Sequence, residues 1–324
     1  MPIPILAIML GVVLLLWSAD RFIDGASAVA GHIGLPSLVI GMVIVGFGTS
    51  APEIVVSIMA ALDGNPELAL GNALGSNIYN IGLIIGVTAL IVPIAVHSKI
   101  IRRELPLLLL FGALAGVFFW NDQLGRWESL LLLLGFFGLM GWTTWAALRG
   151  RGDPSAEETK QTFSSPAMTL GRAIFWLLVG LTLLLVSSRM LVWGAVSVAS
   201  ALGVSDLIIG LTIVALGTSL PELASSIAAV RKGEHDMAIG NVVGSCMFNL
   251  LAVVGIAGVI APMEALSTEI MRRDWPVMMA MVVGLFIMGY GVHGEGRINR
   301  IEASMLLLGV VVYNGWLISA VLNI

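Results

Sequence analysis

The segment Gly46-Phe47-Gly48-Thr49-Ser50-Ala51-Pro52-Glu53 returns 169 residues later as Ala215-Leu216-Gly217-Thr218-Ser219-Leu220-Pro221-Glu222. Each copy lies inside a long hydrophobic stretch that we expect to span a membrane. A charged side chain at the centre of a bilayer costs at least ~2.5 kcal/mol on insertion scales. Two glutamates at matching positions, each beside a proline and two hydroxyls, therefore indicate an ion site.

The composition is typical of an integral membrane protein. Hydrophobic residues make up 58% of the chain and charged residues 11%, and the mean hydropathy is +1.00. Soluble domains carry roughly 25% charged residues. Apolar runs of about 20 residues, each able to cross ~30 Å of hydrocarbon as a helix, recur from end to end. We therefore predict an all-α protein in a lipid bilayer, with no nucleic-acid partner. Because Cys246 is the only cysteine, we predict no internal disulfide.

Ten transmembrane helices are predicted from these runs. The first starts at Ile3 with no Lys or Arg before it, which argues for a span and against a cleaved signal peptide. The predicted spans are residues 3–29, 37–62, 67–93, 103–120, 127–148, 169–200, 206–230, 236–261, 274–292 and 301–322.

Basic residues are distributed unequally between the two sides that these spans define. The poorer side holds Arg126, Arg272 and Arg273. The richer side holds Lys99, Arg102, Arg103, Arg149, Arg151, Lys160, Arg172, Arg231, Lys232, Arg297 and Arg300. By the positive-inside rule the richer side is cytoplasmic, which places both termini on the extracytoplasmic side.

The chain is a duplication. Residues 40–93 laid over 209–262 without a gap agree at about two positions in five. Because five spans per half is an odd number, the second half enters the membrane from the opposite side, as in an inverted repeat. We predict a first five-helix repeat (1–148), a cytoplasmic linker (149–168) and a second, inverted repeat (169–324).

The prolines predict broken helices near the middle of the membrane. Pro52 cannot bond to the Gly48 carbonyl, and Pro221 cannot bond to the Gly217 carbonyl. Inside a bilayer, freed carbonyls are tolerated only where protein, water or an ion satisfies them. Transporters build binding sites at such breaks.

Each half also carries a polar stripe after its glutamate. Asn72, Ser76 and Asn80 recur as Asn241, Ser245 and Asn249, at four-residue intervals that place each set on one helix face. We expect these stripes to face the glutamate-bearing helices. Carboxylate, hydroxyl, amide and carbonyl oxygens suit a hard cation, calcium above all, although sodium and protons remain open.

Together, the paired Gly-Thr-Ser-x-Pro-Glu segments and the trailing Gly-Asn-x-x-Gly-Ser-x-x-x-Asn segments resemble the cation/calcium antiporter superfamily, and prokaryotic sodium/calcium exchangers in particular. The resemblance implies that Glu53 and Glu222 bind calcium and sodium in turn. It implies a metal-binding set completed by Thr49, Thr218, Ser50, Ser219, Asn80, Asn249, Ser76, Ser245, Gly46 and Ala215. Family exchangers commonly carry an aspartate at one of the positions of Asn80 and Asn249, and its absence here puts potassium co-transport in doubt.

The sequence therefore predicts a secondary antiporter in a prokaryotic plasma membrane that exchanges Ca²⁺ for Na⁺ by alternating access. The alternative is an H⁺/Ca²⁺ or other divalent cation antiporter of the same fold. A cation channel would need a continuous charged pore, and an intramembrane hydrolase would not need duplicated polar stripes. We predict no enzyme activity and no cofactor beyond the transported ions; the oligomeric state is open, with a monomer expected.

Several polar and small residues have simpler interpretations. We expect the pairs Gly71/Gly75 and Gly240/Gly244 to mark close helix packing, and Cys246 to be a packing residue. For Ser57 and Ser226 we expect hydrogen bonds to backbone carbonyls. Asn72 and Asn241 either bridge helices or bind an ion.

Overall fold

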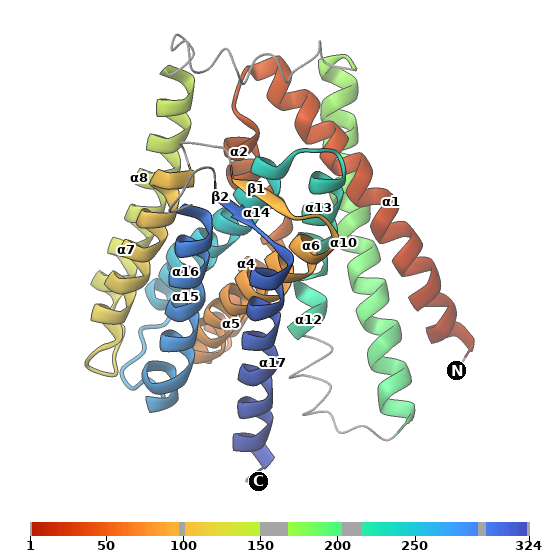
Figure 1. Ribbon diagram of the computed structural model, residues 1–324. Helices are drawn as coiled ribbons and strands as arrows, with labels where there is room; N and C mark the ends of the chain where they lie inside the picture. The colour runs from red at the N-terminus through yellow and green to blue at the C-terminus, as the bar shows by residue number, and fades with distance from the viewer. Residues whose placement is uncertain (1, 97–100, 150–167, 203–214, 291–295, 323–324) are drawn as a thin grey trace.

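The protein is a helical bundle, drawn in Figure 1. The structure is a computed structural model that describes residues 2–96, 101–149, 168–202, 215–290 and 296–322. All long elements within these residues are helices, which confirms the predicted all-α membrane fold.

The first half begins with the long helix α1 (Pro2–Ile33). A broken rod follows, made of α2 (Ser37–Ile40), the π-helical η1 (Gly41–Val45), α3 (Gly46–Thr49) and α4 (Ala51–Leu62). The next rod comprises α5 (Pro66–Tyr79), the π-helical η2 (Asn80–Ile85) and α6 (Gly86–Ile91). The half ends with strand β1 (Ile94–Val96) and helices α7 (Ile101–Phe119) and α8 (Arg126–Arg149).

The second half repeats this order. It begins with the long helix α10 (Leu170–Ala201) and continues with α12 (Ala215–Thr218) and α13 (Leu220–Arg231). The next rod comprises α14 (His235–Met247), the π-helical η5 (Phe248–Val253) and α15 (Val254–Ile260). The half ends with η6 (Ile270–Asp274), α16 (Trp275–Tyr290), strand β2 (Gly296–Ile298) and α17 (Arg300–Leu322).

Helices α1 and α10 lie side by side and antiparallel at one edge of the bundle (Figure 1). A Cβ added at Gly11 would lie 3.1 Å from Leu191, and one added at Gly180 would lie 2.6 Å from the backbone of Phe22. Under the 169-residue repeat, Gly11 corresponds to Gly180 and Phe22 to Leu191. The two contacts are therefore one contact repeated about a two-fold axis, as an inverted repeat requires.

Both glutamate-bearing rods are broken where the sequence places the prolines. The backbone leaves helical geometry at Ser50 (φ −82°, ψ 2°) and at Ser219 (φ −89°, ψ 2°). Pro52 and Pro221 fall in the first turn of the following helix, where a missing N–H is tolerated. In the first half the two parts of the rod meet at 48°. The breaks place Glu53 and Glu222 in the first turns of α4 and α13.

Six of the described helices are long and apolar enough to cross a membrane, or seven if the bent rod counts as one span. Helix is present in each of the ten predicted segments, but the number of spans stays a prediction. The predicted linker, 149–168, lies almost wholly outside the described residues, as does the start of the segment 206–230.

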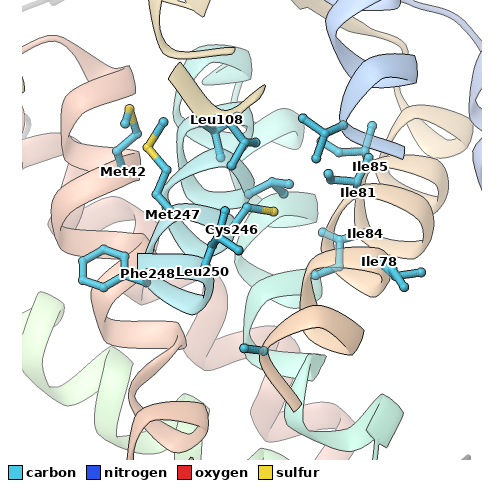
Figure 2. Packing of buried hydrophobic residues seen from close by; sticks show 14 of the residues in the cluster. Met42, Ile78, Ile81, Ile84, Ile85, Leu108, Cys246, Met247, Phe248 and Leu250 are labelled. Atoms are coloured by element: carbon cyan, nitrogen blue, oxygen red, sulfur yellow. The ribbon is translucent and has the colours of Figure 1, made fainter. Parts of the chain in front are cut away.

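The rods α5–α6 and α14–α15 form the centre of the bundle. In their most apolar stretches 67% and 83% of the residues are buried, against 28% or less in α1, α8, α10 and α17. Figure 2 shows the core there, with Met247 beside Met42 and with Cys246 among aliphatic side chains. Cys246 is fully buried with a free thiol, so its expected role as a packing residue is confirmed.

Two short strands add to the helical prediction. Ile94, in β1, pairs antiparallel with Ile298, in β2. A single bridge joins Leu124 to Met263, which is the repeat counterpart of Ile94. Each half thus contributes one extended residue to a pairing with the other half, and these links join the halves outside the helices.

Candidate cation-binding site

The two glutamates are buried in the protein interior. Glu53 is 2% exposed and Glu222 is 1% exposed, and Ser50, three residues before Glu53, lies within 3.3 Å of the Glu222 carboxylate. One oxygen of each, Oε2, has no hydrogen-bond partner among the described residues. A buried carboxylate without partners is strongly destabilising unless a cation or a proton compensates it. The geometry therefore calls for a positive charge between the two halves.

A hydroxyl of the first half reaches the carboxylate of the second. The Ser50 Oγ donates to Glu222 Oε1 at 3.3 Å, and Ser50 is the residue at which the first rod breaks. Because the backbone leaves helical geometry at Ser50, its hydroxyl does not follow the face of a regular helix. Its position joins the two halves directly at the glutamates.

Asn241 is the centre of the hydrogen-bond network around Glu222. Its Nδ2 lies 2.9 Å from Ser226 Oγ, 3.2 Å from Ser225 Oγ and 3.3 Å from the Glu222 carbonyl. Its Oδ1 accepts a hydrogen bond from Thr49 Oγ1 at 3.2 Å. Of the two roles open for Asn241, the structure gives it the helix-bridging one.

The counterpart network in the first half is smaller. Asn72 Nδ2 donates to Ser57 Oγ at 3.3 Å. Ser57 and Ser226 therefore accept hydrogen bonds from the amide N–H groups of the polar stripes. The prediction was that both hydroxyls donate to backbone carbonyls, and the structure shows no such bond among the described residues. In both halves the asparagine donor comes from the helix that follows the serine's own helix.

Two serines that the sequence analysis did not single out contact carbonyls of the second rod, one of them at its break. Ser188 Oγ, on α10, donates to the Gly217 carbonyl at 3.0 Å, the carbonyl that Pro221 leaves free. Ser225 Oγ lies 2.8 Å from the Pro221 carbonyl. A hydroxyl in the middle of an apolar helix is the signal for Ser188. Ser225 gives no repeat signal, because its counterpart is Val56.

The two polar stripes supply further buried oxygens. Asn80 and Asn249 are 2% and 1% exposed, and Ser76 and Ser245 are 7% and 0% exposed. Ser245 Oγ and both polar atoms of the Asn249 side chain have no partner among the described residues. Unpartnered buried polar atoms are rare in native proteins. Their position on the stripe next to the glutamates makes Ser245 Oγ and Asn249 Oδ1 candidate cation ligands.

The other predicted site residues lie at the helix breaks. Gly46 begins α3 and packs against α14, where an added Cβ would lie 3.2 Å from the Ser245 nitrogen. Thr49 and Ser219 are buried, and Thr218 is partly buried at the end of α12, which Ala215 begins. No group of three His, Cys, Asp or Glu side chains exists within the described ranges, so any further ligands there come from hydroxyl, amide and carbonyl groups.

Comparison with known proteins places this arrangement in a family. The sequence profile of the sodium/calcium exchanger proteins matches residues 3–145 and 172–319. The chain belongs to the sodium/calcium exchanger family.

Individual relatives of this exchanger agree over nearly their whole lengths. It is 46% identical over 314 residues to the putative antiporter CaxA of Alkalimonas amylolytica, covering 97% of this chain and 98% of the relative. It is 28% identical over 341 residues to the sodium/calcium exchanger MaX1 of Methanosarcina acetivorans, covering 95% and 96%. A solved structure of the sodium-calcium exchanger NCX_Mj, soaked with zero Na⁺ and Ca²⁺, superposes with a TM-score of 0.82 at 29% identity, covering 96% and 97%.

Membership in the exchanger family confirms the predicted superfamily and makes the chain a membrane transporter of cations. It also removes the support for the channel and hydrolase alternatives, since neither is the activity for which this family is named.

Proposed function

We propose that the protein is a secondary antiporter that exchanges Ca²⁺ for Na⁺ across a prokaryotic plasma membrane. The observation that carries the proposal is the pair of buried carboxylates, one from each half, with Ser50 of the first half donating to Glu222 of the second. A relative of similar length is named a sodium/calcium exchanger, which supports the same pair of ions.

Charge balance explains how one site can serve both ions. Glu53 and Glu222 supply two negative charges, enough to neutralise one Ca²⁺ or two Na⁺. The two kinds of ion then compete for the same oxygens, so only one occupies the carboxylates at a time. An empty site would carry two uncompensated charges through the bilayer, which costs several kcal/mol. Exchange follows because the halves change orientation only when the site is filled.

The remaining oxygens complete the coordination that calcium requires. Calcium takes 6–8 oxygen ligands in flexible geometry. We assign this role to the hydroxyls or carbonyls at the two breaks and to the stripe residues, namely Thr49, Ser50, Thr218, Ser219, Gly46, Ala215, Ser76, Ser245, Asn80 and Asn249. With asparagine at both stripe ends, a potassium ion would have no counter-charge, and we propose that none is carried.

Protons are the alternative coupling ion. Each glutamate has one oxygen without a hydrogen-bond partner among the described residues, and protonation of both would discharge the site as fully as two sodium ions. An H⁺/Ca²⁺ antiporter would use the same residues and the same fold.

Calcium flux into everted membrane vesicles separates the two proposals. Vesicles loaded with Na⁺ and diluted into Na⁺-free medium should take up radioactive calcium while an ionophore collapses the proton gradient. Glu53→Gln and Glu222→Gln should each abolish uptake, whereas Glu264→Gln, at an exposed carboxylate, should leave it unchanged. Uptake that follows the proton gradient and ignores sodium would favour the alternative, and no uptake under either gradient would overturn calcium antiport.

A further inference from the structure

The two halves correspond in sequence but differ in how their broken rods are covered. α1 packs along α13, whereas its counterpart α10 barely contacts α4 among the described residues. Val55 and Met59 of α4 are 55% and 52% exposed, while the matching Ala224 and Ala228 of α13 are each 4% exposed. The bundle is therefore closed around α13 and open along α4.

An ion pair fastens the closed side. Lys232 follows α13 directly, and its Nζ donates to Asp24 Oδ1 and to the Asp20 carbonyl of α1, both at 2.6 Å. The Asp20 carboxylate lies 3.9 Å from the same nitrogen. The side chains of Lys232 and Asp24 are 28% and 34% exposed, so water screens their attraction only in part.

The open side carries one charge-reversed pair at the positions of Lys232 and Asp20, while the position of Asp24 is taken by Trp193. Asp63 holds the position of Lys232 at the end of α4, and Arg189 holds the position of Asp20 on α10. Both rods end in the same left-handed turn, with φ of 79° at Gly64 and 80° at Gly233, so Asp63 is presented as Lys232 is. Neither Asp63 nor Arg189 has an ion-pair partner within 4.0 Å in the described part of the chain.

We propose that Lys232 with Asp20 and Asp24 is a latch that holds the described conformation, and that Asp63 with Arg189 is the latch of the opposite conformation. The inference rests on the proposed alternating access. In an inverted repeat the opposite-facing state arises when the two halves exchange arrangements. α10 would then cover α4 and bring Arg189 to Asp63, while α1 leaves α13 and Lys232 loses its partners. Each latch therefore forms where the other opens.

Distances between spin labels test the latch without measuring transport. In a Cys246→Ala background, one label pair at Leu16 and Arg231 spans α1 and α13. The repeat-equivalent pair at Leu185 and Leu62 spans α10 and α4. Lys232→Gln should lengthen the first distance and shorten the second, raising the population ratio of the opposite state by roughly 2- to 5-fold, as expected for a partly exposed ion pair. In the double variant Lys232→Gln with Asp63→Asn, the population of the opposite state should fall back most of the way, because that state then loses its own latch.

Matched variants separate a latch from a local defect. Lys232→Arg keeps the charge and should leave both distance distributions unchanged, and Asp24→Asn should reproduce Lys232→Gln from the other side of the pair. Lengthening of the first distance without shortening of the second would overturn the counterpart latch, and identical distributions in Lys232→Gln and Lys232→Arg would overturn both. If the distances respond but vesicles show no calcium exchange, the proposed function fails while the latch stands.

Discussion

At the residue scale, two asparagines that the repeat makes equivalent have different numbers of partners. Asn241 bonds to Ser225, Ser226, the Glu222 carbonyl and Thr49, and so ties the first turn of α13 to the break in the other half. Asn72 donates to Ser57 alone among the described residues. A buried hydrogen bond contributes about 0.5–1.5 kcal/mol. Asn241 therefore holds Glu222 in place more firmly than Asn72 holds Glu53.

Replacing these asparagines one at a time should show the difference. Asn241→Ala removes the amide that positions Glu222, and we expect the calcium concentration for half-maximal flux to rise by roughly tenfold, equivalent to the loss of about one to two hydrogen bonds. Asn72→Ala, the matched control, should raise it less than threefold. Calcium flux measured over a range of calcium concentrations gives both values. An equal effect of the two substitutions would contradict the positioning role of Asn241.

Asn249 tests whether two negative charges are the right number. Asn249→Asp adds a third carboxylate to a site that one Ca²⁺ neutralises with two, and an uncompensated charge in the membrane costs at least ~2.5 kcal/mol. We expect calcium flux to fall by roughly 50-fold or more near neutral pH and to recover partly when pH falls or potassium is added.

The matched variant Asn249→Ser keeps an oxygen without adding charge. It should retain much more flux than Asn249→Asp and should show no new dependence on potassium. If the aspartate variant transports as well as the wild type without an added cation, the charge balance proposed for the site is wrong.

At the scale of elements, glycines decide which helices come together. Gly240 and Gly244 of α14 pack on the backbone of Leu38 and Met42, which confirms the close packing expected for this pair. The equivalent partners of Gly71 and Gly75, residues 207 and 211, lie outside the described residues, so the expectation for that pair stays a prediction. The closest approach of α1 and α10 occurs at glycines that carry no recognisable motif.

Two alanine substitutions on α10 separate packing from helix propensity. A Cβ at Gly180 would lie 2.6 Å from the Phe22 nitrogen, whereas one at Gly171 would have no atom within 4 Å. Gly180→Ala should destabilise the protein by about 1–3 kcal/mol, as overpacking does, and Gly171→Ala should be neutral or stabilising by up to about 1 kcal/mol. Thermal unfolding in detergent measures both. Equal stability of the two variants would rule out tight packing between α1 and α10.

The same elements show how far sequence reasoning reached. The two helix breaks could be predicted from Pro52 and Pro221, because a proline without an N–H interrupts a helix whatever surrounds it. The π-helical segments at Asn80–Ile85 and Phe248–Val253 were not predicted, since a wider turn depends on packing with neighbouring rods. Ser188 was missed for a related reason: its carbonyl partner, Gly217, is 29 residues away in sequence.

At the scale of the whole molecule, the duplicated sequence predicts a two-fold axis but cannot predict how the halves differ. Equivalent residues give equal expectations, so no pattern could indicate that α13 is covered and α4 is open. That asymmetry is a property of one conformation. The two-fold relation itself could be predicted, and the reciprocal contacts Gly11–Leu191 and Gly180–Phe22 agree with it.

The orientation of the molecule in its membrane is also a property of the whole chain. α1 begins and α17 ends at one end of the bundle, while α8 ends and α10 begins at the other (Figure 1). The end at which α8 stops carries the larger share of Lys and Arg by the predicted topology, and we therefore expect it to be cytoplasmic. A reporter fused after Ile324 should behave as exported: alkaline phosphatase active, green fluorescent protein dark.

A reporter inserted after Glu158, in the linker, should give the opposite result and serves as the control for expression and folding. If both fusions report the same side, an even number of spans lies between the linker and the C-terminus, and the five spans predicted there are wrong. If both are inverted, the basic residues do not set the orientation. In that second case calcium uptake by everted vesicles would still follow the sodium gradient, because the ion gradients and not the orientation of the protein set the direction of antiport.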